Sequence, residues 1–244
     1  MDPGYARSYR DLYENHWWWR AREDLILATL DRLRPLGGWG SILDVGCGDG
    51  LFFSKLEPRG DVEGIEMDPT GVDEKGPWAN RIHVRPFDET FQPGKRYGLV
   101  LMLDVLEHFP DPLRRLRLAL QLLAPGGTLL ITVPAFRAMW TSHDVLNRHF
   151  TRYTREELGN LVREAGGEVG QARYFYQWMS PFKLAAHWKE ALRATTPTTP
   201  RVPPRWLNGF LYRLSRFEQR ALGPLSLPFG SSLLLVARDR PRPV

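Results

Sequence analysis

The sequence predicts one α/β domain built on a mostly parallel sheet, and three observations support this. Short apolar segments typical of buried strands alternate with amphipathic helical patterns. A glycine-rich turn at residues 46–50 follows the first of these segments, and acidic residues follow or end several others. In such a fold the loops after the strands meet at the carboxyl edge of the sheet, so we expect the binding site there.

Composition limits the class of protein. The 244 residues, 43% of them hydrophobic, suffice for one large core, so residues 1–244 are treated as a single domain. No apolar run is long enough to cross a bilayer and the first ten residues are polar, which predicts a cytoplasmic protein. The single cysteine, Cys47, predicts neither a disulfide nor a thiolate metal site.

The net charge of +5 comes mostly from scattered arginines. No repeating stripe of basic and aromatic residues is present, so nucleic acid is not the expected partner. Attraction to an anionic substrate or membrane face stays open as an alternative.

Hydrophobic periodicity gives the expected elements. The strands are expected at 41–45, 61–66, 81–84, 97–103, 128–134, 169–176 and 230–237. The helices are expected at 5–33, 50–55, 111–123, 154–165, 182–192 and 206–221.

Three segments lie outside the regular alternation. Residues 1–38 predict an N-terminal helical cap, and residues 178–228 predict a helical insertion before the last strand. Residues 135–153 are polar with little apolar periodicity, so we expect a substrate loop at the edge of the sheet. Thr195–Pro200 predicts an exposed, flexible stretch.

The turn at 46–50 carries the first chemical signal. Gly46, Gly48 and Gly50 let the backbone turn sharply beneath a ligand, and the following helix presents N–H groups to it. The dinucleotide fingerprint needs a third glycine where this chain has Leu51, so NAD is the weaker interpretation. Glu66 ends the second strand about twenty residues after the turn, where a carboxylate can accept both hydroxyls of a ribose. Asp68 is the alternative for this role.

Four segments in chain order resemble the class I S-adenosylmethionine-dependent methyltransferases. They are the turn Asp-x-Gly-x-Gly-x-Gly at 44–50, the strand ending on Glu66, Asp-Val-Leu-Glu-His at 104–108 and Leu-x-Pro-Gly-Gly-x-Leu at 123–129. The resemblance implies a Rossmann-like, doubly wound sheet of seven mostly parallel strands with an antiparallel last strand. It also implies S-adenosyl-L-methionine as the cofactor.

The resemblance and the turn together give a candidate cofactor site. Its members are Asp44, Gly46, Cys47, Gly48, Gly50, Glu66, Met67, Phe87, Asp88, Leu103, Asp104, Val105, His108, Trp19 and Arg22. In the family pattern Asp88 accepts the adenine amino group and Phe87 touches the ring, although an ordinary solvated acidic loop is an equal alternative. The rings at 17–19 predict either core anchors or a lid, whose faces can stabilise a sulfonium.

His143 and His149 are the expected general bases, with His108 behind them at the pocket floor, because a histidine titrates in the range needed to deprotonate a hydroxyl. The alternative is that these side chains tie down a long loop. His143, Asp144 and His149 suit a metal chemically, but no carboxylate-rich segment accompanies them, so no metal is expected.

The expected acceptor is a small molecule with a hydroxyl or amine, either aromatic or linked to a lipid or sugar. The Asn-Pro-Pro-Tyr motif of enzymes that methylate nucleobase amines is absent, which lowers the nucleic-acid interpretation further. Alternatives are an NAD-linked oxidoreductase and a family member that binds the nucleoside without catalysis. Helix 206–221, amphipathic with arginines, is expected to pack on the domain, with peripheral membrane contact as its alternative. The sequence leaves the oligomeric state open.

Overall fold

The structure is a computed structural model, which describes residues 10–192 and 200–239. It divides into two compact units, which we treat separately. The sheet unit comprises Pro35–Val133, Tyr153–Ala172 and Leu234–Val244. The helical unit comprises Met1–Arg34, Pro134–Arg152 and Arg173–Leu233.

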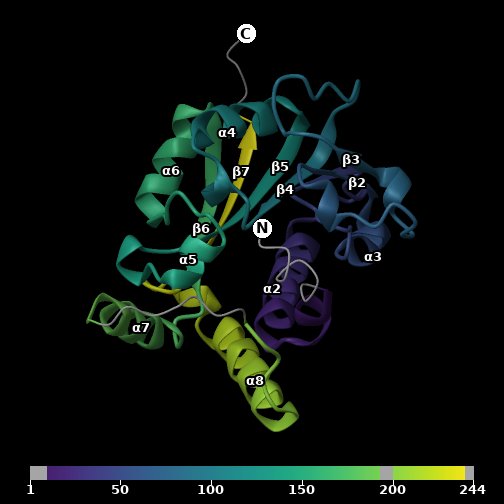
Figure 1. Cartoon of the computed structure of the whole chain (residues 1–244). Coiled ribbons are helices and arrows are strands. Elements are labelled where there is room, and N and C mark those ends of the chain that lie inside the picture. Colours follow the sequence, from purple (N-terminus) through teal and green to yellow (C-terminus); the bar gives the residue numbers. More distant parts are fainter. Residues whose placement is uncertain (1–9, 193–199, 240–244) are drawn as a thin grey trace. The chain divides into compact units, whose positions relative to one another are not determined.

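The predicted seven-stranded sheet is confirmed, in the order β3-β2-β1-β4-β5-β7-β6 (Figure 1). Its first five strands pair in parallel and β7 is antiparallel. β1 and β4 lie at the centre and are almost entirely buried, as continuous apolar strands of a parallel sheet must be. The strands are β1 Ser41–Val45, β2 Asp61–Glu66, β3 Ile82–Val84, β4 Tyr97–Leu103, β5 Leu123–Pro134, β6 Gly167–Phe175 and β7 Ser232–Asp239.

The helices of the sheet unit follow from their capping residues. Asp111 accepts a hydrogen bond from the Arg114 N–H at 3.1 Å, with Pro112 in the first turn of α4. Thr154 and Glu157 form the predicted capping box of α6. α4 and α6 pack against each other (Figure 1). The helices are α3 Phe53–Leu56, α4 Pro112–Gln121 and α6 Arg155–Glu164.

β5 begins at Leu123, five residues earlier than predicted. Leu123 pairs with Tyr97, whereas the next pair joins Thr128 to Leu99, so the intervening residues form an irregularity in the strand. Gly126 takes a φ of 75° within it. The prediction treated this glycine segment as a separator between helix and strand, but the chain is already hydrogen-bonded to β4 before it.

The helical unit contains α2 Trp17–Leu33, α5 Ser142–Leu146, α7 Ser180–Leu192 and α8 Arg205–Ala221, and α2 packs against α8. The expected helix 5–33 is interrupted at His16, whose Nδ1 accepts the Trp18 N–H at 3.1 Å and caps α2. The expected helix residues before Arg10 lie outside the described residues. Most of the expected flexible stretch 195–200 does too.

Residues 135–153 were predicted to form a loop, but they also contain η5 Arg137–Met139 and α5. A capping box formed by Thr141 and Asp144 starts α5. Among the described residues, no helix is long and apolar enough to cross a membrane. The other short helices are η1 Glu57–Arg59, η2 Pro69–Gly71, η3 Ala79–Arg81, η4 Leu106–His108 and η6 Gly223–Leu225.

Candidate active site

The glycine turn lies directly after β1, at the centre of the sheet. Gly46, Gly48 and Gly50 have φ values of 72°, 54° and 67°, a region that favours glycine. A Cβ on Gly46 would lie 2.5 Å from Val105 Cγ2, so a side chain from the end of β4 fills the space beneath the turn. A Cβ on Gly48 would meet nothing within 4 Å, which leaves the turn open on that side.

Glu66 is fixed beneath this open side. Its Oε2 accepts the Gly48 N–H at 2.9 Å, and its Oε1 accepts the Asp68 N–H at 2.9 Å. Each carboxylate oxygen can accept a second hydrogen bond, so the group can still receive two ligand hydroxyls. Asp68 instead caps η2, where its Oδ1 accepts the Thr70 N–H at 3.0 Å.

Asp44 precedes the turn and Cys47 lies within it. Asp44 is 4% exposed, at the end of a strand that is otherwise apolar. Burial, and then the charges of Asp44 and Glu66, raise the pKa of the Cys47 thiol. The thiol therefore stays protonated and acts as a small filler rather than a nucleophile. A Cβ on Gly64 would lie 2.4 Å from Cys47 Sγ, so glycine in β2 makes room for this thiol.

The end of β4 has a constrained backbone. Asp104 takes a φ of 55°, which is uncommon for a residue with a side chain. Its N–H donates to the Thr132 carbonyl at 2.9 Å, and the Thr132 hydroxyl donates to Asp104 Oδ1 at 3.1 Å. Leu103 and Val105 on either side are half-buried. The two bonds from β5 hold this acidic residue in its strained conformation at the sheet edge.

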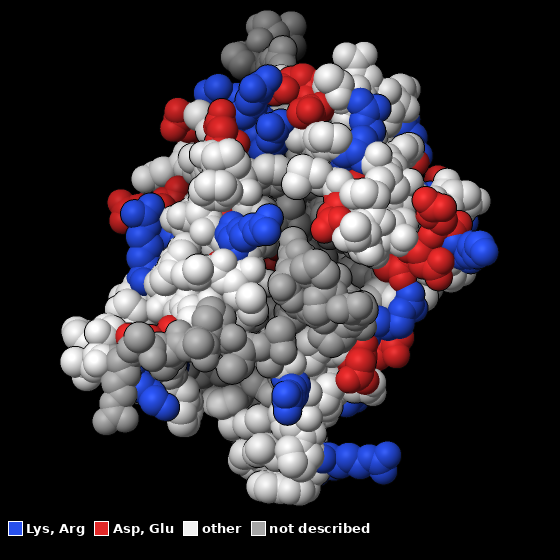
Figure 2. Space-filling model, viewed as in Figure 1, with Lys and Arg blue, Asp and Glu red and all other residues white. Residues whose placement is uncertain are grey.

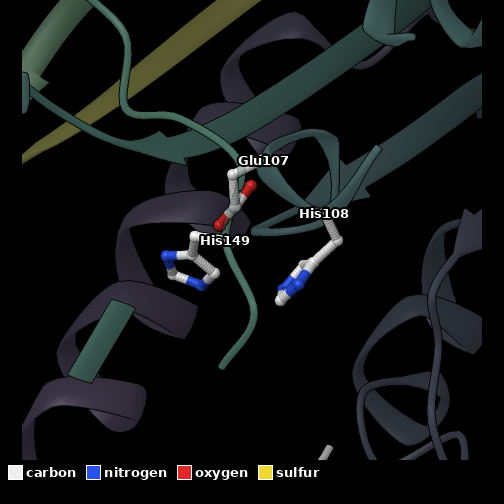
Figure 3. Close-up of side chains that lie close together, drawn as sticks. All are labelled: Glu107, His108 and His149. Atoms are coloured by element: carbon white, nitrogen blue, oxygen red, sulfur yellow. The ribbon is translucent and has the colours of Figure 1, made fainter. Parts of the chain in front are cut away.

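Glu107 and His108 come from η4, directly after this segment (Figure 3). Glu107 is 1% exposed, whereas His108 is exposed to solvent. His108 therefore belongs to the accessible surface of the sheet unit at the same strand end as Asp104. Its predicted role in chemistry stays a prediction.

The predicted adenine-contacting segment adopts a turn. Asp88 Oδ1 accepts the Thr90 N–H at 3.0 Å, and the hydroxyl and N–H of Thr90 lower the pKa of Asp88. Phe87 is 5% exposed and packs beside Phe91, whereas Met67 is 68% exposed. The turn fits the alternative of an ordinary acidic loop as well as the predicted adenine contact.

In the helical unit, Asp144 connects His149 to Arg152. His149 Nδ1, whose side chain is labelled in Figure 3, lies 2.8 Å from Asp144 Oδ1. Arg152 donates Nε to Oδ1 at 2.8 Å and an Nη to Oδ2 at 2.9 Å. Burial alone would raise the pKa of Asp144, but the bonds from His149 and Arg152 outweigh it and hold that pKa well below its usual range. This carboxylate is therefore ionised and already bound by a cation, which makes it a poor ligand for a metal.

His143 differs from His149. Burial, and then the nearby Lys183, lower the pKa of His143 to about 4. Its Nε2 lies 3.0 Å from Asn147 Nδ2. His143 is therefore neutral at physiological pH and only weakly basic, whereas His149 is oriented by a carboxylate as a general base requires.

The N-terminal rings act as packing anchors inside the helical unit. Trp17 is 6% exposed, with its ring 5.8 Å from that of Tyr176 and 5.4 Å from that of Trp178. Trp19 is 9% exposed, and the Arg22 guanidinium lies 5.6 Å from the centre of the Trp18 ring. The expected anchoring is confirmed, while the expected contact of Trp19 and Arg22 with the cofactor stays a prediction.

The family follows from a comparison with known proteins. Residues 18–172 match a family model described as a methyltransferase domain, which is more than half of the chain. The chain belongs to the class I S-adenosylmethionine-dependent methyltransferases. This methyltransferase is an enzyme that uses S-adenosylmethionine, so the NAD-linked alternative is set aside.

Curated relatives share part of the length of this methyltransferase. A ubiquinone biosynthesis O-methyltransferase from Aromatoleum aromaticum is 25% identical over 175 residues, covering 65% of this chain and 68% of that protein. The protein of the same name from Aeromonas salmonicida is 34% identical over 99 residues, covering 37% and 42%.

Solved structures agree with the fold. A putative methyltransferase from Haloferax volcanii, solved in a complex with the Trm112 activator, gives a TM-score of 0.61 at 19% identity, covering 99% of this chain and 96% of that one. The [4+2]-cyclase SpnF gives a TM-score of 0.56 at 18% identity, covering 92% and 86%. Identities this low show the shared fold alone.

Two contributors to these sites were not predicted. In the sequence, Gly64 looks like an ordinary strand residue. Only glycine fits there because Cys47 packs against this position, and that contact is not visible in the local sequence. Arg152 is 3% exposed and binds both oxygens of Asp144, eight residues earlier, although nothing in the local periodicity pairs them. The polar character of 135–153 was the only available signal.

Proposed function

We propose that this methyltransferase transfers the methyl group of S-adenosylmethionine to a hydroxyl of a small molecule. The proposal rests on the 2.8 Å contact between His149 Nδ1 and Asp144 Oδ1. The Asp144 carboxylate is buried and is also bound by Arg152. A hydroxyl acceptor must lose its proton as it attacks, whereas a neutral amine needs no base before attack. The relatives named O-methyltransferases support the same chemistry.

The sheet unit fits the cofactor. The open side of Gly48 and the fixed Glu66 carboxylate form a cradle that a Cβ would fill. We assign the ribose hydroxyls to Glu66 and the neighbouring polar part of the cofactor to the open side of Gly48. The N–H groups of Gly46, Cys47 and Gly50 already donate to backbone carbonyls of the chain. Asp44, Asp104, Met67 and Asp88 keep their predicted cofactor roles, with Phe87 supporting the Asp88 loop from its buried position.

The reaction is a displacement at carbon. S-adenosylmethionine supplies the methyl group as an electrophile; the acceptor oxygen forms the new bond and the sulfur keeps the electron pair of the old one. His149 takes the hydroxyl proton at Nε2, because Asp144 occupies the Nδ1 side. Asp144, kept ionised by Arg152, stabilises the imidazolium that forms, much as a buried carboxylate supports a catalytic histidine elsewhere.

Replacement of His149 tests this assignment. His149→Ala should lower kcat by about 10²- to 10⁴-fold, the range of a general base, while S-adenosylmethionine binds with unchanged affinity. His83→Ala, an exposed histidine on β3, is the matched control and should keep full activity.

The pH profile separates a base from a structural tie. Loss of the acidic limb of the kcat profile in His149→Ala supports the proposal. Wild-type turnover of His149→Ala from pH 6 to 9 contradicts it, as does methylation of a nitrogen or a carbon of the acceptor.

A further inference from the structure

α8 exposes its aromatic residues. Trp206, Phe210 and Phe217 are 75%, 57% and 69% exposed. Positions 206, 210, 213, 217 and 220 follow one another in steps of four and three, so the three rings share a stripe with Arg213 and Arg220. The helix packs on α2 as expected, but Phe210 and Phe217 stay exposed.

The fully buried residues of α8 are polar, whereas Leu207, Leu211 and Leu214 are only half-buried, which is unusual for a surface helix. Its buried residues are Asn208, Ser215 and Glu218. Asn208 accepts the Trp17 N–H at 2.8 Å, and Glu218 accepts the Trp178 N–H at 2.7 Å. Hydrogen bonds thus attach α8 to its unit, and much of its apolar surface is directed outward.

α7 also exposes large apolar side chains. Phe182, Trp188 and Leu192 are 67%, 65% and 81% exposed. The Phe182 ring lies 6.0 Å from the ring of Trp178, whose indole N–H donates to Ser215 of α8 at 3.2 Å. The start of α7 is therefore adjacent to α8 through one shared tryptophan.

The charges of the two helices are segregated. The acidic residues face inward: Glu218 is 4% exposed and Glu190 bonds the Ser142 N–H at 2.6 Å. Every exposed charged side chain on the two helices is a cation: Lys189, Arg205, Arg213 and Arg220. In Figure 2 the region where Figure 1 draws α8 is mostly white, with blue side chains at its margin.

We propose that the exposed face of α7 and α8 binds the surface of an anionic lipid bilayer. Exposed tryptophan and phenylalanine rings insert at the boundary between headgroups and acyl chains, and arginines beside them pair with lipid phosphates. An all-cationic rim complements anionic lipid, so a bilayer is favoured over a protein surface of mixed charge. The proposal does not depend on the acceptor, because binding is measured without one.

Co-sedimentation of the full chain with vesicles tests the proposal. The protein should bind vesicles of phosphatidylglycerol and phosphatidylcholine, bind pure phosphatidylcholine weakly, and dissociate partly as salt rises. Trp206→Ser combined with Phe210→Ser should reduce the partition coefficient at least about tenfold. Leu36→Ser, which removes a fully exposed apolar side chain in the sheet unit, is the matched control and should bind as wild type.

Charge reversal gives a second readout. Arg213→Glu should weaken binding to anionic vesicles severalfold more than Arg117→Glu, which changes the same charge on the exposed side of α4. Because the replaced rings are exposed, circular dichroism and thermal melts should match the wild type. Absence of vesicle binding by the wild type overturns the proposal. So does a loss of binding in Leu36→Ser and Arg117→Glu as large as that in the α8 variants. A wild-type dimer that the double variant converts to a monomer, without vesicle binding, also overturns it and assigns the face to a second copy.

Discussion

Glu66 shows how a single carboxylate organises the cofactor side of the molecule. It accepts N–H groups from Gly48 and Asp68, and so fixes the turn and itself together. The sequence predicted Glu66 from its distance along the chain and left Asp68 as the alternative. Glu66 is favoured because its carboxylate bonds the Gly48 N–H of the glycine turn itself, whereas the Asp68 carboxylate bonds Thr70 of η2.

Glu66→Gln should weaken S-adenosylmethionine binding by about 1–3 kcal/mol, roughly 5- to 150-fold in Kd, because the charge-assisted bonds to the ribose are lost. Glutamine keeps the shape but only one acceptor oxygen, so it can accept either the Gly48 N–H or the Asp68 N–H, and a thermal melt checks that the variant stays folded. Isothermal titration with S-adenosylmethionine and its demethylated product measures the effect. Asp68→Asn is the control, and a larger loss there than at Glu66 would reverse the assignment.

His143 predicts how stability depends on pH. Its pKa is lowered to about 4 in the folded state and is about 6.5 in the unfolded chain, so unfolding takes up a proton between these values. Its contribution is complete above pH 6.5 and is lost as the pH falls toward 4, to a total of about 3 kcal/mol. Urea unfolding at pH 7 and pH 4.5 should show a smaller acid loss in His143→Gln than in wild type. An identical loss in both proteins, with His83→Gln as control, would contradict this.

At the scale of elements, two glycines of the same turn have different surroundings. Gly46 has a left-handed backbone and Val105 beneath it, whereas Gly48 has a left-handed backbone and open space. The two positions therefore predict different defects for the same substitution.

Gly46→Ala should destabilise the fold by more than the roughly 1–2 kcal/mol of left-handed strain, because Val105 must also move. Gly48→Ala should cost only that strain yet weaken S-adenosylmethionine binding at least about tenfold, since its methyl group enters the cradle. Chemical unfolding and titration together check the pair. Equal stability losses with normal binding in Gly48→Ala would show that the open side is not the cofactor cradle.

Elements were predictable where local chemistry decides them. β2 and β4 have the predicted bounds, because the alternation of β2 and the apolar run of β4 both end at clear turn signals. The facing of α8 was not predictable. Its amphipathic pattern fixes which residues share a stripe, but the outward direction depends on distant partners such as Trp17 and Trp178, which bind its polar residues.

At the scale of the whole molecule, the seven strands and the antiparallel last strand were predicted through the family resemblance, and the order of the strands was not predicted. Periodicity identifies a strand, but pairing between β5, β7 and β6 joins segments that lie far apart in the chain. The candidate cofactor-binding residues could be predicted because they lie in short sequence motifs. The bond of Arg152 to Asp144 could not be predicted, because it is set by tertiary packing.

Our central proposal is that this methyltransferase methylates a hydroxyl of a small molecule, with Glu66 binding the cofactor and His149 acting as the base. Its most direct test is transfer of an isotope-labelled methyl group from S-adenosylmethionine into an extract of the source cell, followed by identification of the product. We expect label on an ether oxygen of a hydroxylated aromatic, lipid-linked or sugar-linked molecule. Transfer should be reduced at limiting cofactor in Glu66→Gln, slowed by at least about 100-fold in His149→Ala and retained in His83→Ala. Label confined to nucleic acid or protein, or to nitrogen, or transfer at the wild-type rate in His149→Ala, would contradict it.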